Sequence, residues 1–249
     1  MKEVKAITFR VFRFNPQIDE HPYYDSFEIP TERGITVLRA LDYIKQNLEP
    51  RLSFSSFCHA GICGSCSMKI NGMAKLACTT QVWDELKNSV EKNVITVEPI
   101  NNLPALRDLI VDMQPLVRKL ETYLGWVEPA MPEQEMGKKE CTVSEEEFRV
   151  YDPATDCILC GTCLSDCPAL KADPDYVSPP VLLRSFRMNA DSRDKSEEER
   201  LELLGELHGV MDCRGCNRCA FTCVKNIPIM QAIQSLRERV MQKKLSGKS

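Results

Sequence analysis

Thirteen cysteines in a chain of 249 residues constrain this protein more than any other feature of its sequence. Twelve of them fall into three groups of four with short internal spacings. The redox compartment decides whether such cysteines form disulfides or bind metal ions. The first residues lack the apolar run and small-residue cleavage site of a signal peptide, so we expect a bacterial or archaeal cytosolic chain. Reduced thiols would then be available as metal ligands.

The first group has the spacing C-x4-C-x2-C, followed after eleven further residues by a fourth cysteine. Its members are Cys58, Cys63, Cys66 and Cys78. This spacing is typical of plant-type 2Fe-2S sites. Gly61 and Gly64 lie between the ligands, where a missing side chain permits a tight loop and the approach of backbone amides. A zinc site is the alternative, but zinc modules usually present two separated C-x2-C pairs. We predict a 2Fe-2S cluster at this first site.

The other two groups share the bacterial-ferredoxin spacing C-x2-C-x2-C-x3-C. They are Cys157, Cys160, Cys163 and Cys167, followed by Pro168, and Cys213, Cys216, Cys219 and Cys223. In such paired runs three thiolates hold one cubane cluster and the fourth reaches the other cluster. Because each run gives its fourth cysteine to the other cluster, we predict a middle site with a 4Fe-4S cluster. Its ligands would be Cys157, Cys160, Cys163 and Cys223. The same exchange predicts a last site, a second cubane cluster on Cys167, Cys213, Cys216 and Cys219.

Hydrophobic periodicity predicts a small α+β region around the first group. Apolar and polar residues alternate from Ala6 to Phe14, and Phe27–Ile29 gives a second strand signal. Helical spacing follows over residues 37–44. Two short apolar segments, at residues 68–70 and 73–77, flank Asn71-Gly72, a pair that suits a type I′ hairpin turn.

The remainder of the chain has a helical pattern. Apolar residues recur every three or four positions from Leu103 to Leu124, which predicts a helix that Pro115 kinks or divides. Residues 128–147 are rich in Pro, Glu and Lys without apolar periodicity, so we expect a surface connection. This segment contains Cys141, which lies outside all three groups and receives no role.

Helix-capping signals predict where helices begin in the second half of the chain. Ser178 precedes two prolines and should cap a helix that runs to Met188. Ser196 and Glu199 have the spacing of a capping box for the next helix. A last helix is predicted over residues 228–241, because its apolar residues fall on one face.

Charge and composition exclude other classes of function. A net charge of −4 without a basic patch argues against a nucleic-acid partner. Eighteen consecutive apolar residues occur nowhere, so any membrane attachment must come through a partner. The three histidines, His21, His59 and His208, are scattered, and we predict no catalytic residue. The acidic residues of 197–206 are expected to form a solvated helix face.

The order of the motifs, a plant-type 2Fe-2S pattern before two ferredoxin runs, resembles the iron-sulfur subunit of succinate dehydrogenase and fumarate reductase. The stretch FCHAGICGSC at residues 57–66 is similar to that family's first cluster loop. RDLIVDM at residues 107–113 resembles its interdomain segment, and DSRD at residues 191–194 resembles the stretch before its last cysteine group. The resemblance covers nearly the whole chain.

The resemblance implies an α+β fold, with a β-grasp 2Fe-2S ferredoxin domain at residues 1–105 and an α-helical ferredoxin domain at residues 106–249. It implies a linear relay of three clusters. Electrons would pass between a FAD-containing flavoprotein, where succinate and fumarate are interconverted, and a membrane anchor subunit or quinone. This chain would hold no dicarboxylate. It would lie on the cytoplasmic side of the membrane, held there by partner subunits.

Several positions depart from the family pattern. Most members lack a cysteine at the position of Cys216, and their last cluster is 3Fe-4S; here a second 4Fe-4S cluster of lower potential is expected, with 3Fe-4S as the alternative. Ubiquinone-reducing members carry Trp where Ala172 stands and His where Arg214 stands. Val224 replaces a proline that usually follows the final cysteine. These differences favour a low-potential quinone, or an anchor with its own redox centres, over ubiquinone.

Two other functions compete with this interpretation. A thiol-driven fumarate reductase or another flavin-linked dehydrogenase would use a similar subunit, but such subunits often continue into further cysteine-rich modules, and about 26 residues follow Cys223 here. A redox sensor or structural zinc protein is the other alternative. A sensor usually needs one labile cluster, not three.

Overall fold

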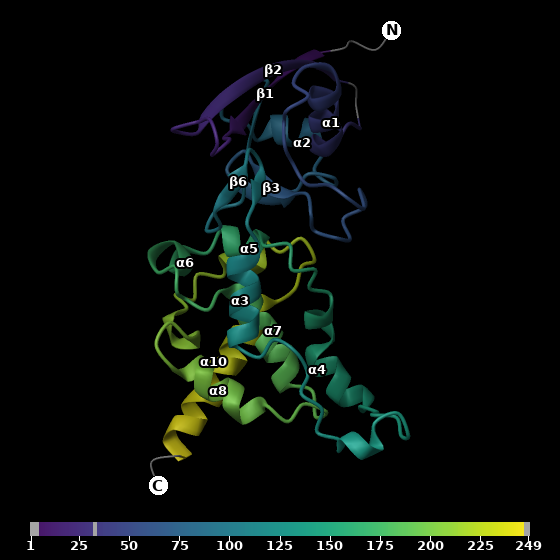
Figure 1. Ribbon diagram of the computed structural model, residues 1–249, viewed down its shortest axis with the longest axis vertical. Coiled ribbons are helices and arrows are strands. Elements are labelled where there is room, and N and C mark those ends of the chain that lie inside the picture. Colours follow the sequence, from purple (N-terminus) through teal and green to yellow (C-terminus); the bar gives the residue numbers. More distant parts are fainter. Residues whose placement is uncertain (1–4, 32–33, 247–249) are drawn as a thin grey trace. The chain divides into compact units, whose positions relative to one another are not determined.

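The computed structural model describes residues 5–31 and 34–246. The chain forms two compact units. The first comprises the chain up to Asp112 together with Ile158–Asp166, and the second comprises Met113–Cys157 and the chain from Cys167 onward. The first unit is a mixed α and β structure and the second is helical (Figure 1). The predicted α+β class and the order of its two parts are confirmed. The predicted domain boundary after residue 105 falls within strand β6 of the first unit.

The first unit is built on a five-stranded sheet of order β2-β1-β5-β3-β4. The strands are β1 (Lys5–Arg13), β2 (Tyr23–Thr31), β3 (Ser67–Ile70), β4 (Met73–Leu76) and β5 (Val94–Glu98). The alternating pattern of β1 is confirmed, and its inward residues Ile7, Phe9 and Val11 are buried. Strand β2 is longer than the predicted Phe27–Ile29, because antiparallel pairing with β1 extends over the full nine residues.

Among the described residues, three helices belong to the same unit as this sheet: α1 (Val37–Asn47), α2 (Val82–Lys87) and the short α5 (Thr162–Ser165). The helical spacing over residues 37–44 is confirmed, since α1 buries its apolar face against the core. Thr36 caps α1 by accepting a hydrogen bond from the Arg39 amide at 3.3 Å. The hairpin between β3 and β4 is also confirmed. Asn71 and Gly72 have φ values of 49° and 82°, as a type I′ turn requires.

The helix predicted over residues 103–124 is wrong in its first half. That segment forms a hairpin of β6 (Ala105–Arg107) and β7 (Ile110–Val111), and helix α3 spans only Gln114–Thr122. Pro115 lies in the first turn of α3, where its missing N–H costs nothing, so it starts the helix and does not kink it. The turn of the hairpin contains Asp108, whose φ of +45° is incompatible with a right-handed helix.

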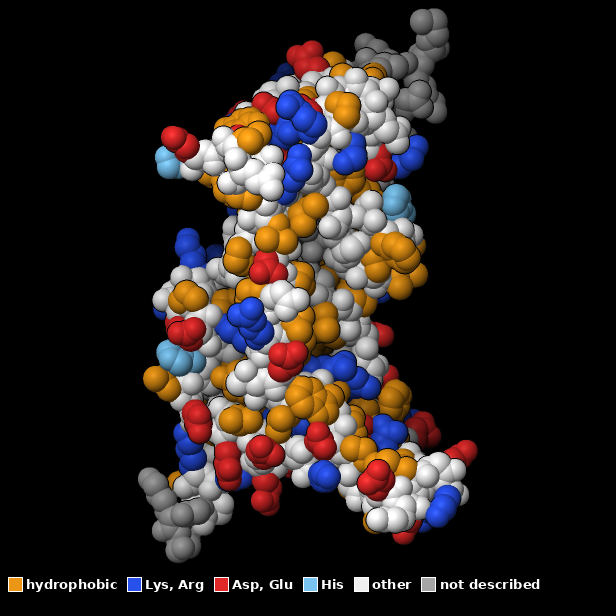
Figure 2. All heavy atoms as spheres, in the orientation of Figure 1, with side chains coloured by type: hydrophobic (Ala, Val, Ile, Leu, Met, Phe, Trp, Pro, Cys, Tyr) orange, Lys and Arg blue, Asp and Glu red, His pale blue; other side chains and the backbone are white. Residues whose placement is uncertain are grey.

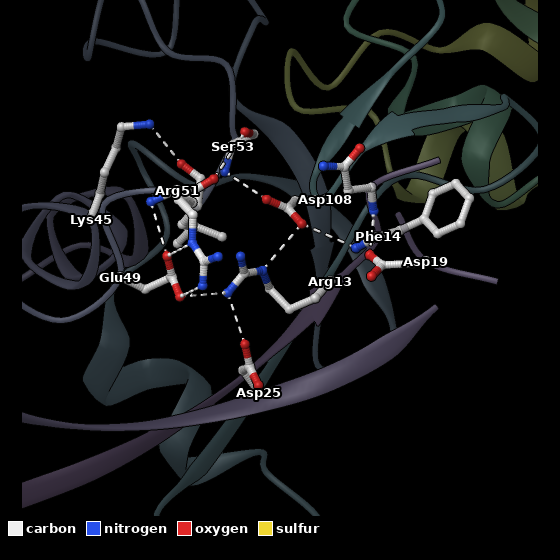
Figure 3. Close-up of polar contacts among 11 residues, drawn as sticks. Arg13, Phe14, Asp19, Asp25, Lys45, Glu49, Arg51, Ser53 and Asp108 are labelled. Atoms are coloured by element: carbon white, nitrogen blue, oxygen red, sulfur yellow. Dashed lines mark hydrogen bonds and ion pairs between the residues drawn. The ribbon is translucent and has the colours of Figure 1, made fainter. Parts of the chain in front are cut away.

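Tertiary hydrogen bonds of Asp108 explain the difference (Figure 3). Its carboxylate accepts the amides of Phe14 at 3.0 Å and Ser53 at 2.8 Å, as well as Nε of Arg13 at 3.1 Å. The buried Arg13 guanidinium also pairs with Asp25 at 2.8 Å. These bonds tie the hairpin to the end of β1. They outweigh the local helical pattern because each satisfies a group removed from water.

The second unit is an assembly of helices. Its longer members are α3, α4 (Glu145–Thr155), α7 (Pro179–Asn189), α8 (Glu197–Gly205) and α10 (Ile229–Ser246), and its short elements are η1 (Glu133–Glu135), α6 (Pro168–Ala172), η2 (Val210–Asp212) and α9 (Arg218–Phe221). Helix α10 packs against α7 and α8 (Figure 1). The predicted last helix is confirmed and extends five residues further, to Ser246. No helix among the described residues has the length and apolarity needed to cross a membrane.

The capping signals predict the helix starts but not the capping bonds. Ser178 and Ser196 directly precede α7 and α8, as predicted, yet neither side chain caps its helix. The Ser196 amide donates to Oδ1 of Asp194 at 2.8 Å, so it is not available to Glu199 and the capping box does not form. Ser178 has a φ of +85°, which departs from the extended backbone of an ordinary N-cap.

The two predicted surface segments are exposed. Most of residues 128–147 lie at the surface, with the short helix η1 within them, although α4 begins before their end, at Glu145. Figure 2 shows acidic side chains on the surface over α8, where Glu198, Glu199 and Glu202 are exposed. This face is solvated, as predicted.

Candidate metal centres

The cysteines of the first site lie around one loop of the first unit. Amides of this loop point at the cysteine sulfurs: those of Ala60, Ile62 and Cys63 lie 3.3–3.4 Å from Sγ of Cys58. The Gly61 amide donates to Sγ of Cys78, 3.3 Å away. Hydrogen bonds of this kind stabilise negative charge on sulfur. The loop therefore supplies donors that suit thiolates bound to iron.

Two glycines make this loop possible, as their positions in the sequence predict. Gly61 has a φ of +70°, and a Cβ there would lie 2.9 Å from Cγ2 of Thr79. Gly64 has a φ of +74°, and a Cβ there would lie 2.8 Å from Cβ of Cys160. Neither position has room for a side chain. The second contact was not foreseen: it brings the loop of the first site against a cysteine assigned to the middle site.

The thiols of the first site differ in acidity. Hydrogen bonds from Ser65, whose Oγ lies 3.1 Å from the sulfur, lower the pKa of Cys63 to about 6. Burial raises the pKa of Cys66 to about 12. A buried thiol that does not ionise by itself becomes a thiolate when a metal cation replaces its proton. The donor set, four thiols with amides directed at them, fits a 2Fe-2S cluster.

All four cysteines assigned to the last site line one pocket of the second unit. Apolar side chains, among them Met230 and Ile233 of α10, form other parts of its wall. Cys167 and Cys219 are buried, and burial raises the pKa of both thiols, that of Cys219 to about 12. Cys216 is the exposed member of the set, yet it faces the same pocket. Four soft donors around one partly apolar pocket fit a cubane cluster.

The cysteines assigned to the middle site are divided between the two units. Cys160 and Cys163 belong to the first unit, and Cys157 and Cys223 belong to the second. In the first unit, Sγ of Cys160 lies 3.3 Å from Oγ1 of Thr162. In the second unit, Sγ of Cys223 accepts the amide of Ile227 at 3.4 Å. The ligand set of this site stays a prediction.

The remaining candidates lie apart from these sites. Cys141 is exposed, with its sulfur 3.7 Å from Sδ of Met131. His208 bonds Asp173 through Nδ1 at 2.6 Å, and His59 lies exposed in the first loop. Sequence reasoning missed Tyr176, whose buried ring lines the pocket of the last site. No motif marks a single tyrosine of this kind, so only the structure could have found it.

Comparisons with known proteins identify the family of this chain. Residues 8–118 match the family described as 2Fe-2S iron-sulfur cluster binding domain, and residues 153–227 match the 4Fe-4S dicluster domain family. The chain is 37% identical to the succinate dehydrogenase iron-sulfur subunit of Coxiella burnetii, over 97% of this chain and 100% of the other. This chain belongs to the family of succinate dehydrogenase and fumarate reductase iron-sulfur subunits.

Other members of the family are similarly close. The fumarate reductase iron-sulfur subunit of Escherichia coli O157:H7 is 33% identical, over 94% of this chain and 93% of that one. A chain of the Mycobacterium smegmatis Sdh1 complex in the apo form has the same fold, with a TM-score of 0.84 at 22% identity and 98% coverage of both chains.

Membership confirms the predicted resemblance, fold and cofactor types. The chain is an electron-transfer subunit of a succinate dehydrogenase or fumarate reductase, an oxidoreductase complex. It binds 2Fe-2S and 4Fe-4S clusters. Its third group of cysteines is consistent with a further cluster.

Proposed function

We propose that this chain carries electrons through three clusters between a FAD-containing flavoprotein subunit and a membrane anchor subunit or quinone. Twelve cysteines in three groups, with eight of them gathered around one loop or one pocket, are the observation that carries the proposal. Each cluster, when bound, takes up and releases single electrons. The chain's own residues hold the clusters, direct hydrogen bonds at their sulfurs and keep part of each site away from water.

The proposed ligands follow the three sites. The first site uses Cys58, Cys63, Cys66 and Cys78 for 2Fe-2S. The middle site uses Cys157, Cys160, Cys163 and Cys223 for 4Fe-4S. The last site uses Cys167, Cys213, Cys216 and Cys219 for a second 4Fe-4S cluster, with 3Fe-4S, lacking Cys216, as the alternative. The position of Cys216 on the same pocket as the other three supports the four-ligand form.

Exposed apolar side chains on the first loop support a docking site for the flavoprotein. Phe57 and Ile62 are 84% and 64% exposed, although large apolar side chains are usually buried. Both flank cysteines of the first site. A partner that covers them would exclude water next to the cluster, and electrons would have a short route across the interface. We propose that the flavoprotein subunit docks on this loop.

The composition of the last site supports an unusual electron acceptor. A fourth thiolate adds negative charge to the cluster, and net charge is one of the factors that set its potential. Arg214, which replaces the histidine of ubiquinone-reducing members, lines the pocket of the last site. We propose a low-potential quinone, or an anchor with redox centres of its own, as acceptor. We also propose that partner subunits hold the chain at the cytoplasmic face of the membrane.

The test is to purify a tagged chain anaerobically from its native host and to follow the cluster absorbance after addition of succinate. We expect a flavin-containing subunit to copurify and succinate to bleach the cluster bands. Phe57→Ser and Ile62→Ser should reduce both the copurification of the flavin subunit and the bleaching by succinate. Val90→Ser is the control, since it changes an exposed apolar residue elsewhere in the first unit, and it should change neither. Bleaching by thiol reductants but not by succinate would favour the thiol-driven alternative. Zinc without sulfide would exclude electron transfer.

A further inference from the structure

A buried hydroxyl without a partner lies at the last site. Tyr176 is 1% exposed, and its hydroxyl makes no well-aligned hydrogen bond among the described residues, although it lies near Sγ of Cys213. Burying a polar group without a hydrogen bond is costly, and native proteins rarely do so without a reason. A group that binds in the adjacent pocket would explain this orphaned hydroxyl.

Sulfurs of the last site lie near that hydroxyl. Tyr176 lines the same pocket as Cys167, Cys213, Cys216 and Cys219. A tyrosine hydroxyl carries its proton at neutral pH, so the hydroxyl of Tyr176 can act only as a donor toward negative sulfur.

The backbone on both sides of Tyr176 is held in place. Lys119 of α3 donates through Nζ to the carbonyls of Pro174 at 2.6 Å and Tyr176 at 2.5 Å. The Tyr176 amide donates to the carbonyl of Asp173 at 3.1 Å, and the Val177 amide donates to the carbonyl of His208 at 2.8 Å. A ring anchored in this way is set toward the pocket before any cluster binds.

We propose that Tyr176 donates a hydrogen bond to the cluster of the last site, through the Cys213 thiolate or an inorganic sulfide, and so raises its reduction potential. The proposal rests on the proposed function, because it requires a cluster at the last site. Reduction makes the cluster more negative, so a hydrogen bond to its sulfur stabilises the reduced form more than the oxidised form. Tyr176 would offset part of the potential decrease that a fourth thiolate causes.

The test compares Tyr176→Phe with the wild-type complex by a redox titration followed by electron paramagnetic resonance. Tyr151→Phe is the control, since it removes another buried tyrosine hydroxyl from the same unit without touching the pocket. We expect Tyr176→Phe to lower the equilibrium constant for reduction of the last cluster by up to about tenfold, which is about 59 mV for one electron. The first and middle clusters should keep their potentials.

The outcomes separate the two proposals. A wild-type complex without a third cluster signal contradicts the proposed function. A third cluster whose potential is the same in Tyr176→Phe and wild type overturns the proposed role of Tyr176 and leaves the proposed function unaffected. If Tyr176→Phe fails to assemble, 3-fluorotyrosine incorporated into the otherwise wild-type complex replaces it. Fluorine hyperfine coupling to the last cluster is then expected, and its absence overturns the inference.

Discussion

Replacing Gly64 by alanine should destabilise the first unit through two separate costs. The first is backbone strain, because Gly64 has a φ of +74°, where a side chain costs about 1–2 kcal/mol. The second is steric overlap. The new Cβ would lie 2.8 Å from Cβ of Cys160 and 3.1 Å from its Cα, closer than the roughly 3.5–4.0 Å of an ordinary carbon contact.

The overlap cannot be relieved by turning a flexible side chain, because the contacted atoms belong to or adjoin the Cys160 backbone. Overpacking of this kind typically costs about 1–3 kcal/mol. Gly64→Ala should therefore cost about 2–5 kcal/mol in total. Gly72→Ala is the matched control. Gly72 has a similar φ of +82° but nothing within 4 Å of the added Cβ, so its cost should be strain alone, about 1–2 kcal/mol.

Anaerobic guanidinium unfolding of the full chain with its clusters, followed by visible circular dichroism, compares the two variants. The expected midpoint shift is roughly 0.5–1 M for Gly64→Ala and roughly half that or less for Gly72→Ala. Gly64→Ala should also alter the paramagnetic resonance of the cluster that Cys160 is predicted to bind. Equal midpoints for the two variants, with unchanged resonance, would refute the steric argument.

Three further predictions follow from other contacts. Asp108→Ala removes the acceptor of Nε of the buried Arg13 and of two backbone amides, and should cost about 3–5 kcal/mol in the same unfolding assay. Cys216→Ala should convert the last cluster to 3Fe-4S, which is paramagnetic when oxidised. His208→Asn should lower the thermal midpoint at pH 6 but not at pH 9. The hydrogen bond to Asp173 raises the pKa of His208, so its stabilisation is complete below about 6.5 and disappears as pH rises through the folded-state pKa.

Each of these predictions has its own control and contradicting result. For the Arg13 network, Asp25→Ala removes a partly exposed partner and should cost about 0–1 kcal/mol, so equal losses for Asp25→Ala and Asp108→Ala would contradict the argument. Unchanged oxidised spectra in Cys216→Ala would exclude Cys216 as a ligand. For His208, the contradicting result is a difference in thermal midpoint between wild type and His208→Asn that becomes larger as the pH rises.

Features decided by neighbours in sequence could be predicted from the sequence. The Asn71-Gly72 hairpin was predictable because the turn needs only two residues that tolerate positive φ. The tight loop of the first site was predictable for the same reason, since three of its cysteines and both glycines lie within nine residues.

Features decided by distant contacts were not predictable. The spacing of residues 103–124 suits a helix, but Asp108 bonds groups at Phe14 and Ser53 and fixes a hairpin instead. Ser196 has a capping-box partner in sequence, but Asp194 already occupies its amide. Tyr176 carries no local signal, because its importance depends on cysteines that precede and follow it along the chain.

The central claim, a relay of three clusters ending in a second 4Fe-4S cluster, is tested most directly by electron paramagnetic resonance on the anaerobically purified, air-oxidised complex. Oxidised 2Fe-2S and 4Fe-4S clusters give no signal, whereas an oxidised 3Fe-4S cluster does. We predict a silent oxidised sample that holds roughly ten iron atoms per chain and gains three interacting signals on reduction. A strong oxidised signal of about one spin per complex would contradict the fourth ligand and restore the usual form of the relay.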